Sequence, residues 1–317
     1  MAVTAIIDLG SNSVRMDIVK IYSGGQADIL YQTRRMVRLS EDMTDDMRLK
    51  VKPMWRTIEA LKEFKQEMER FGVEEIHAVA TAGVRKAENQ KFFVAEVLRE
   101  TGIALRVISG RQEAVYDFLG VVGSLKIEDG LIVDTGGGST ELIYVKDGMM
   151  HGAESIPMGA VSLSEQFFRQ GESESARQKA AEYVREQLAQ ITWLKECRDI
   201  PVIGLGGSIR TLAKVNIKLS EKDVAIHGYE LSKERSVELC RMIEERSPEE
   251  RKKLRGIDKE RADIIGGGLL PLRCLTEELD TEQVIVSDHG LRTGLLFECI
   301  GKQYKKMLDI LENAEHK

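Results

Sequence analysis

The feature that most constrains the fold of this chain is a stretch of sequence that occurs twice. Residues 6–16 align without gaps on residues 132–142, and an Asp, a Gly and a Ser recur in register. Each copy begins with apolar residues that predict a buried strand, passes through a glycine-bearing turn and ends in an alternating run that predicts a second strand. Internal self-similarity of this kind is typical of duplicated structural units. We therefore predict two related domains with the active site between them.

The second copy suggests what chemistry the turn could serve. Asp134 stands at the end of its strand, three glycines form the turn, and Glu141 follows shortly after. Glycine tolerates positive φ and leaves backbone N–H groups uncovered, which suits the close approach of an anion. A carboxylate at each edge of the turn suits a divalent ion bound to a phosphate. A single copy would fit an ordinary tight hairpin equally well, but the repetition favours a phosphate site.

Strands alternate with helical segments along the whole chain, which indicates the α/β class. A third glycine-bearing unit follows the strand predicted at residues 201–205, where Gly206, Gly207 and Ser208 lead into a helix whose N–H groups could bind an anion. Ser208 alone could instead be a helix N-cap. Helical spacing predicts an amphipathic core helix over residues 53–71 that includes Trp55. The charged run at residues 248–253 predicts solvated surface.

Two further segments place polar side chains just after predicted strands, where ligands bind in open α/β sheets. The first puts Arg85 and Asn89 on one face, and the second has Glu113 in the first turn of a helix. An acid in a first helical turn complements the helix dipole, and spacing alone favours that interpretation over a catalytic one. A strand-like piece near residue 35 fits either a solvated edge strand or a basic rim. Its arginines are Arg34, Arg35 and Arg38.

Net charge and composition limit the classes of partner that the chain can bind. The net charge of −6 provides no bulk attraction to a polyanion, so we expect no nucleic-acid partner and require local basic clusters for any polyanionic substrate. The chain has no apolar run long enough for a membrane span, and its first residues lack the basic region of a signal peptide. We therefore expect no membrane partner.

The cysteines and His289 give no sign of a zinc site. The four cysteines are far apart and form no C-x-x-C pair, which argues against zinc and disulfides and fits a reducing cytoplasm. We expect His289 to support a turn rather than to bind metal, because no partner ligand lies at a suitable sequence spacing.

Seven blocks of sequence, in order along nearly the whole chain, resemble the exopolyphosphatase and guanosine-pentaphosphate phosphohydrolase family (Ppx/GppA). They begin at Asp8, Ala80, Ile108, Asp134, Gly204, Arg261 and Ser287. The family belongs to the actin/Hsp70/sugar-kinase superfamily. The resemblance implies an α/β fold of two duplicated actin-like (ribonuclease H-like) domains that face each other across an active-site cleft. Domain I would comprise residues 1–127, closed by a C-terminal helix at about 292–317, and domain II residues 128–291. On this resemblance we expect the short, two-domain form of the family, without the C-terminal HD-type domain of longer members.

The resemblance also implies roles for individual side chains. Glu113 matches the position that activates the attacking water, and Asp134 and Glu141 match the carboxylates on the catalytic metal. That metal would be Mg²⁺ or another divalent ion, with a monovalent cation as a further candidate. The residues expected to hold substrate phosphates are Asp8, Gly10, Asn12, Ser13, Arg85, Gly136, Gly137, Gly138, Ser139, Gly206, Gly207 and Ser208.

The expected activity is hydrolysis of the terminal phosphate of inorganic polyphosphate, with Arg34, Arg35, Arg38 and Lys86 as candidates for gripping the rest of the substrate. Two alternatives stay open: a guanosine pentaphosphate (pppGpp) 5′-phosphohydrolase, so that the partner is polyphosphate or (p)ppGpp, and a non-catalytic nucleotide-binding regulator. A homodimer is a further candidate state. The chain departs from the family pattern at Gln112, where a second Glu is usual, at Ser208 in place of Thr, and at Thr293 in place of Glu.

Overall fold

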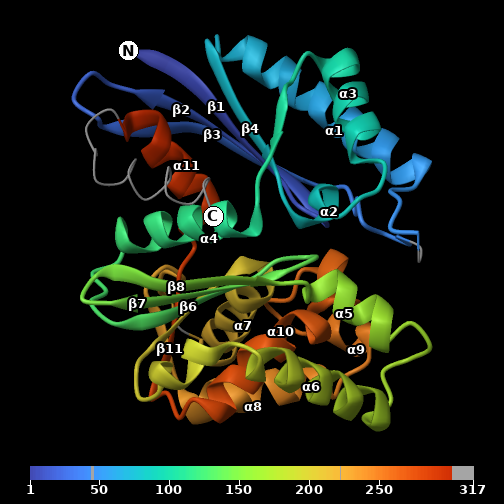
Figure 1. Ribbon diagram of the computed structural model, residues 1–317, viewed down its shortest axis with the longest axis vertical. Coiled ribbons are helices and arrows are strands. Elements are labelled where there is room, and N and C mark those ends of the chain that lie inside the picture. Colours follow the sequence, from blue (N-terminus) through green and yellow to red (C-terminus); the bar gives the residue numbers. More distant parts are fainter. Residues whose placement is uncertain (44–45, 222, 302–317) are drawn as a thin grey trace. The chain divides into compact units, whose positions relative to one another are not determined.

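The computed structural model describes residues 1–43, 46–221 and 223–301 (Figure 1). By proximity of Cα atoms the chain divides into two compact units. The first comprises Met1–Gly120 with the segment from Leu291, and the second comprises Val121–Gly290. We predicted junctions after residues 127 and 291 and retain them as predictions, because compactness does not establish which segment folds alone.

The first unit is a five-stranded sheet in the order β3-β2-β1-β4-β5. Strands β1, β2 and β3 are antiparallel neighbours, whereas β4 and β5 continue the sheet in parallel. Side chains of a strand alternate between faces, so Ile7 packs in the cluster with α1 and α3 while Ile6 packs with Tyr116 of α4 and Leu295 of α11. The strands are β1 Ala2–Leu9, β2 Ser13–Ile21, β3 Ala27–Met36, β4 Glu75–Ala80 and β5 Leu105–Val107. The helices are α1 Val51–Arg70, α2 Ala82–Arg85, α3 Gln90–Thr101, α4 Gly110–Val122 and α11 Leu291–Ile300.

The second unit is a six-stranded sheet in the order β10-β11-β9-β6-β7-β8. Strands β6, β7 and β8 are antiparallel, β9 and β11 run parallel to β6, and β10 adds an antiparallel edge. The strands are β6 Gly130–Thr135, β7 Thr140–Lys146, β8 Met149–Ile156, β9 Val202–Leu205, β10 Tyr229–Ser232 and β11 Gln283–Val286. The helices are α5 Ala160–Phe167, α6 Glu174–Ala189, η1 Thr192–Cys197, α7 Gly206–Leu219, α8 Lys233–Glu244, α9 Pro248–Arg251, η2 Lys259–Arg261 and α10 Ile265–Glu278.

The repeat in the sequence is a repeat in the structure. In each unit a hairpin and a third antiparallel strand are followed by two parallel strands on the other side of the first. The pairing of each hairpin with its third strand also shifts register at an aligned position, after Ile18 in β2 and after Tyr144 in β7. A bulge inserts an extra residue at one defined point of a strand, so its recurrence at aligned positions extends the repeat to the third strand.

Helix α1 confirms the predicted element but not all of its predicted core. Its buried face includes Met54, Leu61 and Phe64, whereas Trp55 is 42% exposed. At about 100° per residue, Trp55 lies about 120° around the helix from Leu61. The expectation that it belongs to the core was wrong, and Lys62 Nζ lies 6.0 Å from the centroid of its ring.

The charged run at residues 248–253 is not wholly solvated, because Arg251 is 0% exposed. Its guanidinium donates to the carbonyl oxygens of Ile243 at 2.8 Å and Glu244 at 3.0 Å, and it pairs with the carboxylate of Glu172. A capping box at Ser247 starts the short helix α9. A buried guanidinium is tolerable only with such a set of acceptors, so this arginine is part of the core.

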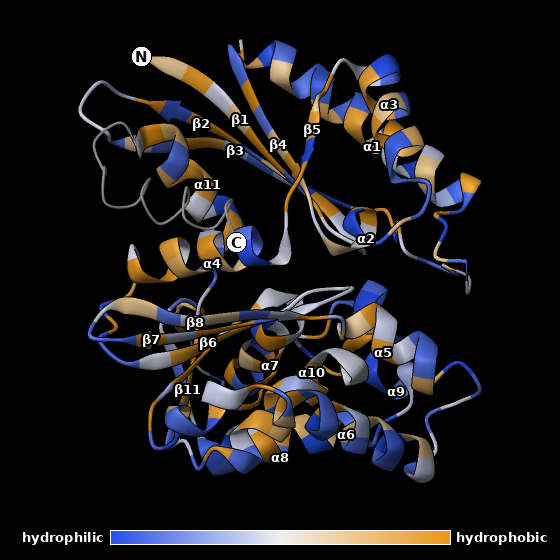
Figure 2. Ribbon diagram, viewed as in Figure 1, coloured by the Kyte–Doolittle hydropathy of each residue, from blue (hydrophilic) through white to orange (hydrophobic). Residues whose placement is uncertain are grey.

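Hydrophilic and hydrophobic bands alternate along helices such as α1 and α8, as expected for amphipathic helices that cover a sheet (Figure 2). Within the described ranges, none of the helices combines the length and the apolar character that crossing a bilayer requires.

Candidate functional site

In the first unit, several predicted phosphate-binding residues gather at the turn between β1 and β2. Asn12 and Ser13 are 6% and 8% exposed, and the Gly10 N–H donates to the Ser13 carbonyl oxygen at 3.0 Å. From behind, the N–H groups of Val37 and Arg38 donate to the Asn12 carbonyl oxygen at 3.0 and 2.9 Å. These bonds fix the turn and neutralise a peptide oxygen that would repel a phosphate.

Arg85 and Glu113, which lie on different helices of the first unit, form an ion pair. Arg85 Nη1 lies 2.9 Å from Glu113 Oε2 and also donates to the Ile108 carbonyl oxygen at 3.0 Å. Their side chains are 21% and 10% exposed. The predicted water-activating acid and the predicted phosphoryl-binding cation are thus neighbours.

Gln112 has a structural role that its sequence neighbourhood could have revealed. The Gln112 N–H donates to Ser109 Oγ at 3.1 Å, and the Ser109 N–H donates to Gln112 Oε1 at 2.8 Å. This reciprocal pair is a capping box at the start of α4, with the S-x-x-Q signature. Glutamine serves that role as well as glutamate does, so the departure from the family pattern leaves the cap intact.

Asn89 does not share a helical face with Arg85, as we had predicted. Helix α2 ends at Arg85 and α3 begins at Gln90, so no continuous helix joins the two side chains. The Asn89 amide instead makes 2.9 Å hydrogen bonds to both the N–H and the carbonyl oxygen of Leu49. It fastens the segment that leads into α1.

The arginines near residue 35 lie on or just after β3, which is the edge strand of its sheet. Arg35 forms a surface ion pair with Glu63 at 2.8 Å, with side chains 47% and 54% exposed. Exposed pairs of this kind contribute little to stability, and charges on an edge discourage aggregation.

In the second unit, Asp134 and Glu141 are directly opposite each other on β6 and β7. Opposed residues of an antiparallel pair lie on the same face with Cβ atoms about 5 Å apart. Glu141 is 1% exposed, and Ser155 Oγ donates to its Oε1 at 2.7 Å.

The first hairpin offers an internal comparison for these two acids. There the residue opposite Asp8 is Arg15, so the second charge of the pair is a cation. In the second hairpin the same position holds an acid, and two carboxylates on one face of a sheet repel. A hard divalent cation between them would remove that repulsion, and oxygen ligands are what Mg²⁺ prefers. These residues therefore fit the metal that the family resemblance implies.

The turn at residues 136–138 is held by hydrogen bonds from the start of α5. The N–H groups of Ala160 and Val161 donate to the carbonyl oxygens of Gly136 and Gly137 at 2.9 and 2.8 Å. A Cβ at Gly159 would lie 2.6 Å from the Gly137 carbonyl carbon and oxygen. The glycine at 159 thus allows the helix to dock closely, and Ser139, 1% exposed, completes the turn.

The third glycine loop lies against the second hairpin. Gly206 has φ +88°, and a Cβ there would lie 2.7 Å from Asp134 Oδ1. Both the backbone angle and the contact require glycine. Ser208 is buried, with its hydroxyl packed on Gly268 of α10, so the N–H groups at the start of α7 are the nearer candidates for an anion.

Arg261 is a residue whose role we had not predicted, although it opens one of the sequence blocks. Its guanidinium lies against Gly207 and would overlap any Cβ there, and the residue is 7% exposed. A buried cation at a glycine loop is a favourable setting for a phosphate oxygen. Only the contact with Gly207, 54 residues earlier in the sequence, reveals it.

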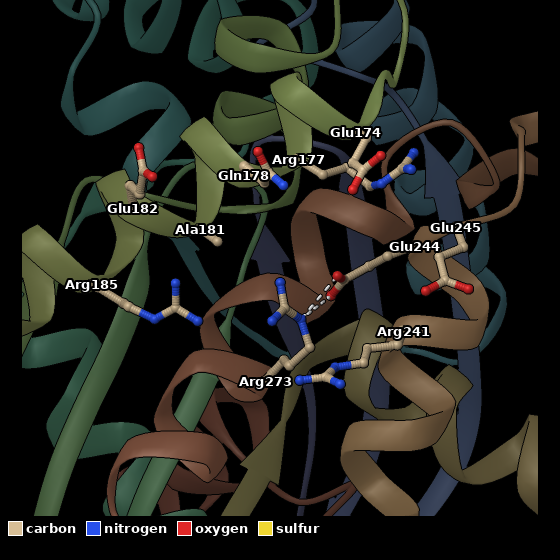
Figure 3. A pocket seen from close by; sticks show the side chains of 10 residues that line it. All are labelled: Glu174, Arg177, Gln178, Ala181, Glu182, Arg185, Arg241, Glu244, Glu245 and Arg273. Atoms are coloured by element: carbon tan, nitrogen blue, oxygen red, sulfur yellow. Dashed lines mark hydrogen bonds and ion pairs between the residues drawn. The ribbon is translucent and has the colours of Figure 1, made fainter.

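A separate pocket of about 720 Å³ lies among α6, α8 and α10 of the second unit and is lined mainly by arginines and glutamates (Figure 3). Arg273 Nε donates to both oxygens of Glu244, at 3.0 and 2.9 Å, and its Nη1 donates to Glu277. Burial raises the pKa of the Glu244 carboxyl, against the opposing charge of Arg273. Burial acts likewise on Glu277, but the hydrogen bond from Arg241 and the charge of Arg273 outweigh it and lower the pKa. Arg185, Arg241 and Arg273 are all hydrogen-bonded to glutamates. We therefore interpret the pocket as an ion-pair network that joins three helices.

The predicted site residues thus form two sets. The first unit holds Asp8, Gly10, Asn12, Ser13, Arg85 and Glu113, and the second holds Asp134, Gly136, Gly137, Gly138, Ser139, Glu141, Gly206, Gly207 and Ser208. That the two sets face each other stays a prediction.

The two sheets have matching strand orders, and each begins with a hairpin whose turn, at Gly10 or at residues 136–138, is a predicted phosphate-binding turn. This arrangement defines the class of protein: the chain has the actin-like fold. A model of the Ppx/GppA phosphatase family matches residues 18–303, and the chain belongs to this family.

Individual relatives agree with this assignment. A crystal structure of the Aquifex aeolicus member of the Ppx/GppA family matches with a TM-score of 0.78 and 33% identity, over 96% of this chain and 99% of that one. A bifunctional 3-dehydroquinate synthase/phosphatase of Fusobacterium nucleatum is 31% identical over an alignment of 312 positions that covers 93% of this chain and 46% of that protein. A Haemophilus influenzae protein provisionally named as an exopolyphosphatase is 28% identical over an alignment of 305 positions that covers 92% of this chain and 90% of that one. The chain therefore spans about half the length of the Fusobacterium relative.

Proposed function

We propose that the protein catalyses metal-dependent hydrolysis of the terminal phosphoanhydride bond of inorganic polyphosphate. Membership of a phosphatase family supports the reaction class, and the Haemophilus relative, matched over most of its length, supports the substrate. The observation that carries the proposal is the pairing of Asp134 with Glu141 beside a glycine turn. Two carboxylates with phosphate-binding N–H groups are the groups that phosphoryl transfer requires.

In this proposal each unit supplies part of the machinery. Glu113 orients the attacking water and accepts its proton, and Arg85, already hydrogen-bonded to Glu113, holds the terminal phosphoryl group. The N–H groups of the turns at Gly10 and Gly137 and of the loop at Gly207 bind phosphate oxygens. Asp134 and Glu141 would hold a divalent ion, which when bound neutralises charge on those oxygens. The two units would close over the chain end as a hinge, and Arg34, Arg38 and Lys86 would contact the rest of the polyphosphate.

The decisive experiment is phosphate release from long-chain polyphosphate, measured with Mg²⁺ and after its removal by a chelator. We expect Mg²⁺-dependent release in the wild type and strong loss in Glu113→Gln. Binding of polyphosphate without release under any metal condition would overturn the proposal in favour of the non-catalytic regulator.

Guanosine pentaphosphate is the second candidate substrate, because its terminal phosphoanhydride presents the same reacting group to the same residues. The ratio of kcat/KM values for polyphosphate and pppGpp decides between them, since it reports differential stabilisation of the transition state. A value larger for pppGpp would reassign the substrate while leaving the reaction class unchanged.

We also propose that the protein works in the cytoplasm. All four cysteines, which lie in the described ranges, are unpaired. Burial raises the pKa of the Cys274 and Cys299 thiols to about 12, so both stay protonated and unreactive. Unpaired, packed thiols fit a reducing compartment. Localisation of the tagged protein by fractionation tests this.

A further inference from the structure

His227, Asp288 and His289 come together in the second unit although the histidines are 62 residues apart in the sequence. One ligand atom from each residue lies within 4.8 Å of the others. Sequence spacing gave His289 no partner ligand, whereas the fold brings His227 close to it from the segment before β10. His289 does also support its turn, through hydrogen bonds of its backbone with the Ser287 hydroxyl.

The pairing of two strands positions these groups. In the antiparallel pair of β10 and β11, Tyr229 is opposite Val286. Before this pair the chain makes a turn, in which the Tyr229 N–H donates to the Ile226 carbonyl oxygen at 3.0 Å. The Gly228 N–H donates to the Val286 carbonyl oxygen at 2.8 Å, which holds the turn that carries His227 against the end of β11.

Backbone hydrogen bonds hold the turn that carries the other two groups. The Ser287 N–H donates to the Gly204 carbonyl oxygen of β9 at 2.9 Å, and Ser287 is 0% exposed. Asp288 and His289 are therefore presented by a fixed turn, which is the kind of preorganisation that a metal site needs.

We propose that His227, Asp288 and His289 form a second metal site, for a transition ion of the zinc type. His227 Nδ1 and His289 Nε2 lie 3.1 and 3.5 Å from Asp288 Oδ1. Tetrahedral ligands at about 2.0 Å from Zn²⁺ are about 3.3 Å apart, so these separations match those around such an ion. Two imidazoles and a carboxylate select zinc-type ions, whereas the all-oxygen set of Asp134 and Glu141 suits Mg²⁺.

The site has access to solvent and leaves coordination positions for water. The side chains of His227, Asp288 and His289 are 26%, 40% and 42% exposed. An ion bound there would join the turn before β10 to the turn after β11, at the end of the second unit. We therefore expect the ion to stabilise the second unit against unfolding, independently of the phosphatase reaction.

The test is a titration of the untagged, chelator-treated full chain with Co²⁺, followed by visible absorption in excess Mg²⁺, and then displacement by Zn²⁺. We expect one tightly bound Co²⁺ per chain and a rise in Tm with Zn²⁺. His227→Ala, His289→Ala and Asp288→Asn should each weaken binding by at least about tenfold, since even outer-shell changes cost about 10–100-fold. The Zn²⁺-dependent rise in Tm should disappear with them.

Matched controls separate this site from others. His151→Ala removes an exposed histidine of the same unit whose ring lies near Tyr144, and Asp134→Asn alters the proposed Mg²⁺ site. Both should bind Co²⁺ like the wild type. Absence of stoichiometric binding in the wild type, or equal loss in either control, would overturn the proposal.

Discussion

At the scale of single residues, Glu113 and Gln112 are adjacent in sequence and have different partners. Glu113 accepts a hydrogen bond from Arg85, whereas Gln112 caps α4. General-base assistance is worth about 10²–10⁴-fold in rate, so Glu113→Gln should lower kcat for phosphate release by about that factor. Substrate binding should persist, because the change removes a negative charge from an anion site.

Gln112 provides the control for this experiment. Gln112→Ala should cost about 0.5–1.5 kcal/mol of stability through the lost hydrogen bond from the Ser109 N–H and change kcat only modestly, while Gln112→Glu retains the capping box. Urea unfolding and steady-state kinetics on the same samples measure both effects. Equal losses of kcat in Gln112→Ala and Glu113→Gln would remove Glu113 from its role as base.

Asp134 and Glu141 are opposed in the second hairpin. We therefore expect Glu141→Gln to be more stable than the wild type without metal and less stable with it. In a chelator, Glu141→Gln should stabilise the fold by about 0.2–1 kcal/mol, because it removes a like-charge pair directly across the strands. With Mg²⁺ the wild type should gain stability and the variant should gain little. Thermal unfolding in both conditions measures this, and Glu154→Gln, an exposed acid on β8, should respond to neither. A variant that is stabilised by Mg²⁺ as much as the wild type would contradict the metal assignment.

Which residues could be predicted depended on how local their signals are. Asp134 and Glu141 belong to one hairpin, so a repeat in the sequence was enough to pair them. The capping role of Gln112 had a local signature that we did not use. Arg261 and His227 meet their partners only through tertiary packing, and the spacing of nearby residues indicates no role for either side chain.

At the scale of elements, glycines determine how closely the helices dock on the phosphate-type turns. Gly159 has φ −146° and ψ 178°, which alanine adopts without strain, so a substitution there tests the contact with Gly137 alone. Gly159→Ala should cost about 1–3 kcal/mol through overpacking and raise KM for substrate, because the turn must move. Chemical denaturation and kinetics measure the two effects.

Gly24 is the matched control, since a Cβ there would meet nothing within 4 Å. Gly24→Ala should stay within about 0.5 kcal/mol of the wild type, as surface changes usually do. If Gly159→Ala behaved the same way, the close docking of α5 would not be what holds the turn.

Helices and strands were predictable where apolar residues recur at a regular spacing. They were less predictable where a charged side chain is buried. The helical spacing over residues 53–71 correctly predicted α1. Arg251 was misassigned because its sequence shows only a charged run, whereas its acceptors come from Ile243, Glu244 and Glu172. A buried ion pair with a partner 79 residues away has no local periodicity.

At the scale of the whole molecule, the duplicated α/β architecture followed from the repeat, and the family assignment agrees with it. No hairpin motif specifies how the two sets of site residues cooperate, because each motif is local and each unit has a hydrophobic core of its own. The proposed function makes a definite claim here: Glu113 of the first unit and Asp134 of the second act on the same phosphoryl group.

That claim predicts strong non-additivity in a double-mutant cycle of kcat/KM. In the proposal, Asp134 helps to position the phosphoryl group that is attacked by the water bound to Glu113. In Asp134→Asn that group is no longer positioned, so activation of the water by Glu113 contributes little to the rate. The double variant Glu113→Gln/Asp134→Asn should then be scarcely slower than the slower single variant, as in catalytic groups that act as a unit. Independent sites would instead give multiplied losses. Glu113→Gln combined with Glu154→Gln is the control pair and should be as slow as Glu113→Gln alone. Multiplied losses in the Glu113/Asp134 pair would show that the two units do not share one reaction centre.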